Sequence, residues 1–114
     1  MHSLVFLATV LCGFAAFPAQ ATVLLMGCKD NNRSYELRYD DEADSLASVT
    51  DGVMSQFILR NLKSENGSVT ILGTLPDRGW DFTFVYRFTP SITYHFPNGG
   101  KRTDNCEVTG RRNR

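Results

Sequence analysis

The chain has 114 residues, with twelve basic and twelve acidic side chains, so its formal net charge at neutral pH is zero. This length suits one small domain, and the balanced charge argues against a nucleic-acid-binding protein, which would show a clear basic excess. We therefore expect a single domain without a nucleic-acid partner.

The first segment has the pattern of a cleavable signal peptide. Its apolar stretch over residues 4–17 is too short to span the roughly 30 Å hydrocarbon core of a bilayer. In residues 19–21, Ala-Gln-Ala, the two alanines are small residues at the positions that a signal peptidase must admit. We therefore predict that residues 1–21 are removed, that the protein is periplasmic or secreted, and that no stable membrane span remains. Two alternatives stay open: an uncleaved anchor that continues through residues 23–26, and a lipoprotein acylated at Cys28.

Cysteine usage in the mature part predicts one structural disulfide. Removal of the signal peptide leaves Cys28 near one end of the domain and Cys106 near the other. Two cysteines in an exported chain allow only one pairing. On a chain-entropy model, a loop of this length contributes about 4–5 kcal/mol to stability. The chain has no Cys-x-x-Cys motif, so a structural bridge is favoured over a redox role.

The mature sequence then alternates between short strand patterns and turn signals. Glycine-containing turn dipeptides at 51–52 and 66–67, and turn clusters at 76–79 and 97–100, separate the strand patterns. The expected strands span residues 34–39, 45–50, 54–62, 68–75, 81–88, 92–96 and 101–109. The segment from Val53 to Leu62 also fits one face of a helix, but its flanking turns favour a strand.

The clearest strand carries four aromatic side chains at strict period two: Phe82, Phe84, Tyr86 and Phe88. This spacing places all four on one face of a pleated strand and is incompatible with a helical stripe. In a domain this small, we expect these rings to fill the core, with a ligand cavity as the alternative. Trp80, which follows a turn, is expected to be partly exposed.

Together these patterns predict an all-β domain over residues 22–110, followed by a frayed basic tail at 111–114. Seven or eight short strands joined by tight turns favour an antiparallel up-and-down meander, closed into a small barrel or packed as a sandwich. The terminal disulfide would place the first strand beside the last. Barrel closure would remove the exposed edges that invite aggregation.

No catalytic or metal-binding constellation emerges. His95, the only histidine of the mature chain, alternates with inward-facing aromatic residues and should face solvent. The spacing of Asp40, Glu42 and Asp44 resembles a calcium loop, but the loop lacks the required glycine and the final glutamate, which favours a solvated turn. We therefore expect no cofactor, no metal and no catalytic residues.

The most promising surface feature is the turn Asn98, Gly99, Gly100, Lys101 and Arg102. Two flexible glycines stand beside two cations at a hairpin tip, which would suit insertion into an acidic cleft or contact with an anionic surface. We predict this loop as a partner-binding site, with an envelope or extracellular protein as the partner. The oligomeric state stays open.

The general layout resembles the periplasmic inhibitors of c-type lysozyme, which also pair a signal sequence with a small meander barrel and a cysteine near each end. The resemblance covers architecture only: the inhibitory Ser-Gly-x-x-Tyr loop of that family is absent, and residues 66–69, Asn-Gly-Ser-Val, do not match it. It implies a binding or inhibitory role and transfers no functional residue.

The expected function is thus a non-enzymatic binding or inhibitor-like module. One alternative is a ligand-carrying barrel, which would need an internal apolar cavity of roughly 300 Å³ or more. Another is a small hydrolase that uses carboxylates such as Asp40, Asp41 or Asp81. It would need two carboxylates about 5–10 Å apart across a groove.

Overall fold

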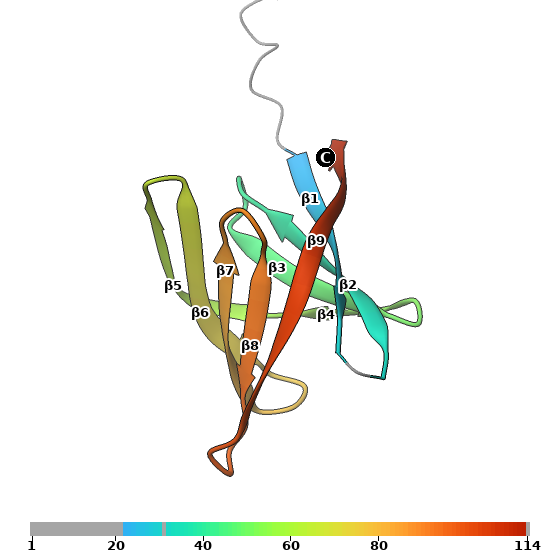
Figure 1. Ribbon diagram of the computed structural model, residues 1–114, viewed down its shortest axis with the longest axis vertical. Coiled ribbons are helices and arrows are strands. Elements are labelled where there is room, and N and C mark those ends of the chain that lie inside the picture. The colour runs from blue at the N-terminus through green and yellow to red at the C-terminus, as the bar shows by residue number, and fades with distance from the viewer. Residues whose placement is uncertain (1–21, 31, 114) are drawn as a thin grey trace, which may run out of the picture.

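The computed structural model describes residues 22–30 and 32–113, which form nine strands joined by turns (Figure 1). The strands are β1 (Thr22–Lys29), β2 (Ser34–Asp40), β3 (Ser45–Thr50), β4 (Val53–Gln56), β5 (Ile58–Glu65), β6 (Ser68–Leu75), β7 (Trp80–Tyr86), β8 (Ser91–His95) and β9 (Lys101–Asn113). Within these residues there is no helix whose length and apolar character would allow it to span a bilayer. The predicted signal peptide, residues 1–21, lies outside the described residues.

All nine strands belong to one antiparallel sheet in the order β4-β3-β2-β1-β9-β8-β7-β6-β5. Sequential strands are neighbours throughout, except that β1 pairs with β9 and that β4 and β5 stand at the two ends of the order. The sheet curls into a half-barrel (Figure 1). The prediction of an all-β antiparallel meander is confirmed, with slightly more strands than the expected seven or eight.

The predicted disulfide joins β9, the middle strand of the order, to its neighbour β1. Cys28 of β1 lies opposite Cys106 of β9, with their Cα atoms 4.0 Å apart, and their sulfur atoms are bonded. The β1–β9 ladder then runs on to the C-terminal end of β9, where Arg111 and Arg112 pair with β1. The strand therefore extends beyond its expected end, into the segment predicted to be a frayed tail. It does so because β1, which begins at Thr22, supplies a hydrogen-bonding partner for these residues.

The segment from residue 53 to residue 65 is extended and not helical, as its flanking turns predicted, but it is divided into two strands. β4 pairs with β3, whereas β5 pairs with β6 at the other end of the sheet order. The change of partner takes place at Phe57, whose backbone N–H donates to the carbonyl oxygen of Leu46 over 2.9 Å. The ring of Phe57 is buried and lies 5.1 Å from that of Phe82, centroid to centroid. One short connection thus joins the two edges of the curled sheet.

The core fills the concave side of the sheet. In β1, β6, β7 and β8, every second residue is buried over part of the strand, as period-two alternation requires. The fully buried apolar side chains include Met26, Leu37, Leu46, Ile71, Phe82, Phe84 and Ile92. The predicted core role is therefore confirmed for Phe82 and Phe84. It is wrong for Phe88, which is 93% exposed because β7 ends at Tyr86 and Phe88 lies in the turn before β8.

Candidate binding pocket

The turns of the meander alternate between two ends of the half-barrel. The turns that follow β1, β3, β6 and β8 lie toward one end, which we call the mouth (Figure 1). The beginning of β1 and the end of β9 lie at the opposite end, together with the turns that follow β2, β5 and β7 (Figure 1). The mouth is therefore framed by four connections that are far apart in the sequence.

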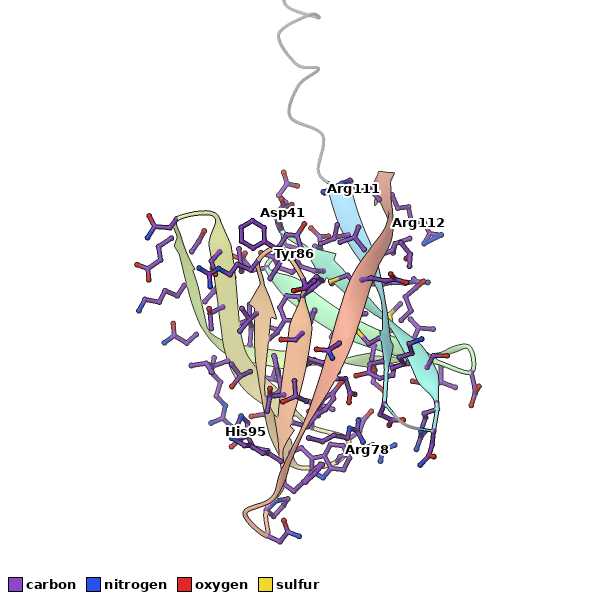
Figure 2. The ribbon with its side chains drawn as sticks, in the orientation of Figure 1. Asp41, Arg78, Tyr86, His95, Arg111 and Arg112 are labelled. Carbon is purple, nitrogen blue, oxygen red and sulfur yellow. A yellow bond between two sulfur atoms is a disulfide. The ribbon has the colours of Figure 1, made fainter. Side chains whose placement is uncertain are left out.

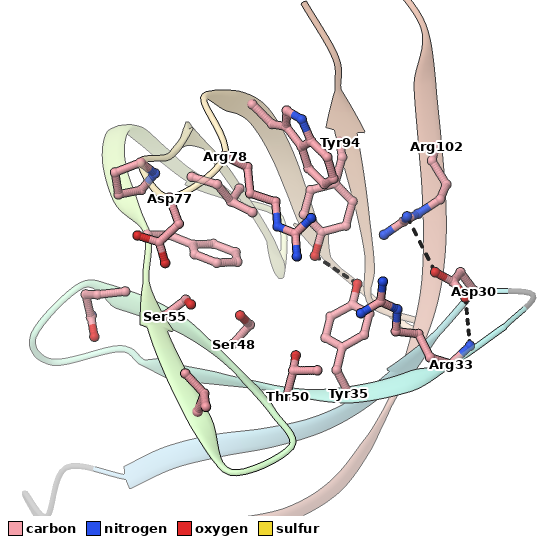
Figure 3. Close-up of a pocket in the computed structure, with 16 residues that line it drawn as sticks. Asp30, Arg33, Tyr35, Ser48, Thr50, Ser55, Asp77, Arg78, Tyr94 and Arg102 are labelled. Carbon is pink, nitrogen blue, oxygen red and sulfur yellow. Dashed lines mark hydrogen bonds and ion pairs between the residues drawn. The ribbon is translucent and has the colours of Figure 1, made fainter.

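A cavity of about 500 Å³ opens at the mouth (Figure 3). We call it the mouth pocket. It is lined by Asp30, Arg33, Tyr35, Ser48, Thr50, Val53, Ser55, Gln56, Phe57, Leu75, Pro76, Asp77, Arg78, Trp80, Tyr94 and Arg102. Its wall combines three guanidinium groups, two carboxylates and several hydroxyl groups with an aromatic and aliphatic side.

Strand alternation explains how polar groups reach this cavity. On β3, the inward positions change from apolar Leu46 to Ser48 and Thr50 as the strand approaches the mouth. On β9, the buried Cys106 is followed toward the mouth by Asp104 and then by Arg102, whose side chain lines the pocket. The same strand alternation that buries the core residues thus also places hydroxyl groups and charges on the concave face near the mouth.

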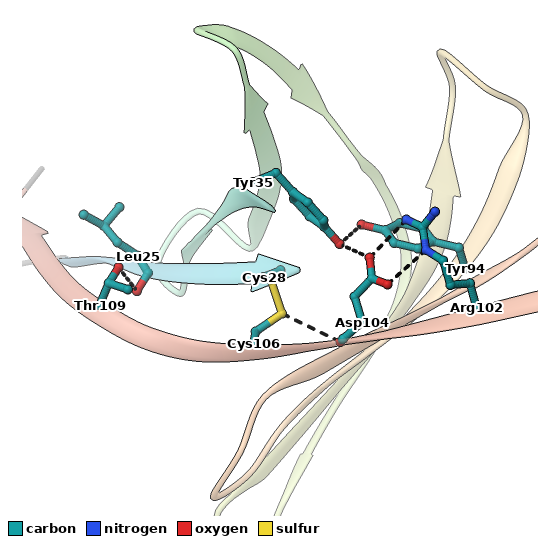
Figure 4. Close-up of a disulfide and its surroundings, with 8 residues drawn as sticks. All are labelled: Leu25, Cys28, Tyr35, Tyr94, Arg102, Asp104, Cys106 and Thr109. Carbon is teal, nitrogen blue, oxygen red and sulfur yellow. Dashed lines mark hydrogen bonds and ion pairs between the residues drawn. A yellow bond between two sulfur atoms is a disulfide. The ribbon is translucent and has the colours of Figure 1, made fainter. Parts of the chain in front are cut away.

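A hydrogen-bonded network forms the inner boundary of the mouth pocket (Figure 4). The Tyr35 hydroxyl donates to Oδ2 of Asp104 over 2.6 Å and lies 2.8 Å from the Tyr94 hydroxyl. Arg102 donates to both oxygens of Asp104, over 2.9 and 3.0 Å, and its Nη1 lies 3.4 Å from a carboxylate oxygen of Asp30. Asp104 itself is buried. Its charge is tolerated because these donors replace the water that burial removed.

The surroundings shift the pKa of several groups that line the pocket, among them two tyrosines and Asp30. Burial, aided by the nearby Asp104 charge, raises the pKa of Tyr94 to about 12, although the hydrogen bond with Tyr35 acts the other way. Burial first, and then Tyr94 and Asp104, raise the pKa of Tyr35 far above its usual range. The backbone N–H groups of Asn32 and Arg33 lower the pKa of Asp30. Both phenols stay neutral and Asp30 stays charged at neutral pH.

Two guanidinium groups of the pocket differ from Arg102. Within the part of the chain that the structure describes, neither Arg33 nor Arg78 forms an ion pair with a carboxylate. Arg78 lies over the Trp80 ring, with its Cζ atom 5.0 Å from the ring centroid. Both groups point into the cavity, Arg33 from the β1–β2 turn and Arg78 from the β6–β7 turn (Figure 3).

The predicted partner-binding loop, residues 98–102, lies at the mouth. Asn98, Gly99, Gly100 and Lys101 are exposed, and the Asn98 side chain accepts a hydrogen bond from the backbone of Gly100 over 2.8 Å. Arg102 is different, because its half-buried side chain is tied to Asp104 and Asp30. The loop thus contributes one structural arginine to the pocket wall, and its exposed tip does not line the pocket.

The other candidate residues lie outside the mouth pocket. Asp41 is exposed at the end opposite the mouth, next to the buried Asp40 (Figure 2). Asp81 is exposed and lies in register with His95, which is also exposed, so neither reaches the cavity. In the described ranges, no group of three or more His, Cys, Asp or Glu residues is arranged to hold a metal ion. The structure therefore does not bring Asp81 together with Asp40 and Asp41 across a groove.

Sequence reasoning missed most of the pocket. A signal was available in Ser48 and Thr50, which share a strand face with Leu46, and in Asp104, which shares one with Cys106. Polar residues on a core-facing side indicate that this part of the interior is wet or internally paired. Nothing local marks Arg33 and Arg78 as members of one site, because they belong to turns far apart in the sequence.

Comparisons with protein-family models, with curated proteins and with solved structures found no match to this chain.

Proposed function

We propose that this chain is an exported, non-enzymatic binding module that holds a ligand, or a protruding group of a partner protein, in the mouth pocket. The observation that carries the proposal is the change along the concave face of the sheet, from a packed apolar core to a cavity lined with hydroxyls and charges. The volume of about 500 Å³ lies within the range typical of small-molecule sites.

The pairing of the polar groups favours binding over catalysis. An acid–base catalyst needs a proton position that faces the substrate and a pKa near the working pH. Tyr35, Tyr94 and Asp104 instead use their polar atoms on one another and on Arg102. Their neutral phenols and paired carboxylate make a fixed wall, which suits recognition of a shape and a charge.

The packing of the core favours a ligand at the mouth over an apolar ligand carried inside the half-barrel. The deeper part of the concave side is filled by fully buried side chains such as Leu46, Ile71 and Phe84. The exposed tip around Lys101 stands at the edge of the opening, where it would meet a protein partner. An envelope or extracellular protein that inserts a side chain or a chain end is therefore the partner that we propose.

A pocket-filling variant tests the proposal. Ser55 lines the pocket from β4, and Ser55→Phe would occupy part of its volume. Ser64→Phe places the same ring on exposed β5 and serves as the control. The wild-type protein and both variants are recovered from their native compartment under mild conditions, and bound molecules are identified by native mass spectrometry.

We expect the wild type and Ser64→Phe to carry the same bound molecule and Ser55→Phe to have lost it. Circular dichroism would verify that both variants keep the sheet. Equal retention by all three proteins, or no bound molecule on any of them, would refute the proposed function.

A further inference from the structure

We infer that the ligand of the mouth pocket presents one carboxylate to Arg33 and Arg78 and packs an apolar body against Trp80. This inference rests on the proposed binding function and adds the chemical class of what is bound. The carboxylate belongs either to a small organic acid or to the chain end or acidic side chain of a peptide.

The ion pairs of the pocket indicate which two of its three arginines are able to bind a ligand carboxylate. The guanidinium of Arg102 already contacts Asp104 over 2.9 Å and Asp30 over 3.4 Å. Among the described residues, Arg33 and Arg78 pair with no carboxylate, and both are exposed within the opening. A guanidinium offers a planar fork of donors that matches a carboxylate. Two such groups that enter one cavity from separate turns form an anion-recognition site.

The negative charges of the pocket limit the charge of the ligand. Asp30 and Asp77 line the same cavity, and Asp104 lies directly behind Arg102. A second negative charge on the ligand would meet this repulsion without a further unpaired arginine in the wall to offset it. A singly charged carboxylate therefore fits better than a doubly charged phosphate.

The aromatic side of the pocket indicates an apolar body beside the carboxylate. Trp80 is held by edge-on contacts with Phe96, at 4.6 Å between ring centroids, and with Tyr94, at 5.9 Å. Leu75 and the buried Phe57 continue this apolar side. A fixed ring beside two cations suits a molecule that has a flat or aliphatic part and one acid group.

Trp80 also supplies the readout, because it is the only tryptophan of the chain. The probes are 4-phenylbutyrate, its neutral analogue 4-phenylbutyramide, and inorganic phosphate. A tripeptide that ends in a free phenylalanine carboxylate and its C-terminal amide distinguish a peptide source from a small acid. Each is titrated into the disulfide-bonded protein while Trp80 fluorescence and binding heat are recorded.

We expect the acids to bind at least about tenfold more tightly than their amides, because charged hydrogen bonds are lost in the amides. Arg33→Gln should remove this preference. Arg60→Gln makes the same change at an exposed arginine of β5 that does not line the pocket, and it should keep the preference. If the peptide acid binds more tightly than 4-phenylbutyrate, a protein partner is the source, and the reverse order indicates a small acid.

Equal binding of acid and amide, tighter binding of phosphate, or an unchanged affinity in Arg33→Gln would overturn the inference. A failure of this inference can be distinguished from a failure of the proposed binding function. If no anion changes Trp80 fluorescence while Ser55→Phe still loses the native ligand, the binding function stands and the carboxylate assignment falls.

Discussion

Asp104 places a carboxylate on the concave face of the sheet, with its side chain 0% exposed to solvent. Removing a charge from water costs several kcal/mol unless hydrogen bonds and an opposite charge replace the hydration. Tyr35 and Arg102 provide both, since each donates to this carboxylate. The inner boundary of the pocket is therefore already satisfied, and only side chains nearer the opening, such as Arg33 and Arg78, remain to bind a ligand.

Because of the two phenols of this network, the free energy of unfolding depends on pH in the alkaline range. The ordinary tyrosine pKa is 10.0, and burial raises that of Tyr94 to about 12 and that of Tyr35 further. Below pH 10 both phenols are neutral in the folded and unfolded states, and their contribution to stability is complete. As pH rises above 10, the unfolded state loses protons first, so the free energy of unfolding falls, and for Tyr94 this fall ends near pH 12.

Ultraviolet titration of tyrosinate, combined with urea unfolding at each pH, measures this effect. We expect Tyr35→Phe to reduce the alkaline loss of stability, because this variant removes the phenol with the larger shift. If all tyrosines ionise together near pH 10 in the folded protein, the network does not hold its protons as described.

At the level of single residues, the sequence correctly predicted side-chain orientations that follow from strand alternation. It did not predict contacts between side chains of different strands. The inward orientation of Phe82 and Phe84 follows from their own strand. The partnership of Tyr35 with Asp104 joins residues that are 69 positions apart, so no local pattern contains it. Phe88 was misplaced because the alternation continues in sequence beyond the point where β7 ends.

Among the elements, the division between β4 and β5 has the largest effect on shape. The sequence predicted one extended segment there, and its backbone is indeed extended on both sides of Phe57. The division could not be foreseen, because it arises when the first part pairs with β3 and the second with β6. A change of pairing strand is decided by tertiary structure, so it leaves no periodic signal in the sequence of the segment.

Gly73 of β6 permits this change of partner. A Cβ atom at Gly73 would overlap the carbonyl oxygen of Ile58 and would come within 2.8 Å of the Phe82 ring. Backbone atoms cannot yield as a flexible side chain does, so we expect Gly73→Ala to destabilise the protein by about 1–3 kcal/mol. It should also loosen the end of the pocket that Phe57 lines.

Gly110→Ala is the matched control, since its Cβ would lie at an ordinary 3.9 Å from Leu25. Thermal and urea unfolding of both variants measure the difference. Equal stabilities of the two variants would show that the close approach of β5 to Gly73 does not hold in solution.

For the molecule as a whole, the disulfide and the strand alternation predicted the fold class well. Two cysteines with one possible pairing, and turn signals between alternating runs, were sufficient for an antiparallel meander whose first and last strands pair. The mouth pocket was not predictable in the same way. Its walls come from separate strands and turns that become neighbours only when the sheet curls.

The position of the disulfide predicts a global effect on stability. Cys28 and Cys106 are separated by 78 positions, so their bond restricts nearly the whole unfolded domain. We expect the double variant Cys28→Ser/Cys106→Ser to lose about 4–5 kcal/mol of unfolding free energy. Urea unfolding measures this loss, and the wild type unfolded in the presence of a reductant should show the same value. A loss below about 1 kcal/mol would contradict the chain-entropy explanation.

The beginning of β1 and the end of β9 lie opposite the mouth, and this placement has a practical consequence. β1 begins and β9 ends side by side at that far end, in register with each other. A linker attached beyond either one would orient the molecule with Arg33, Arg78 and Trp80 facing away from the support. Immobilisation on a sensor surface through such a linker, or display from a carrier, would therefore present the opening to molecules in free solution.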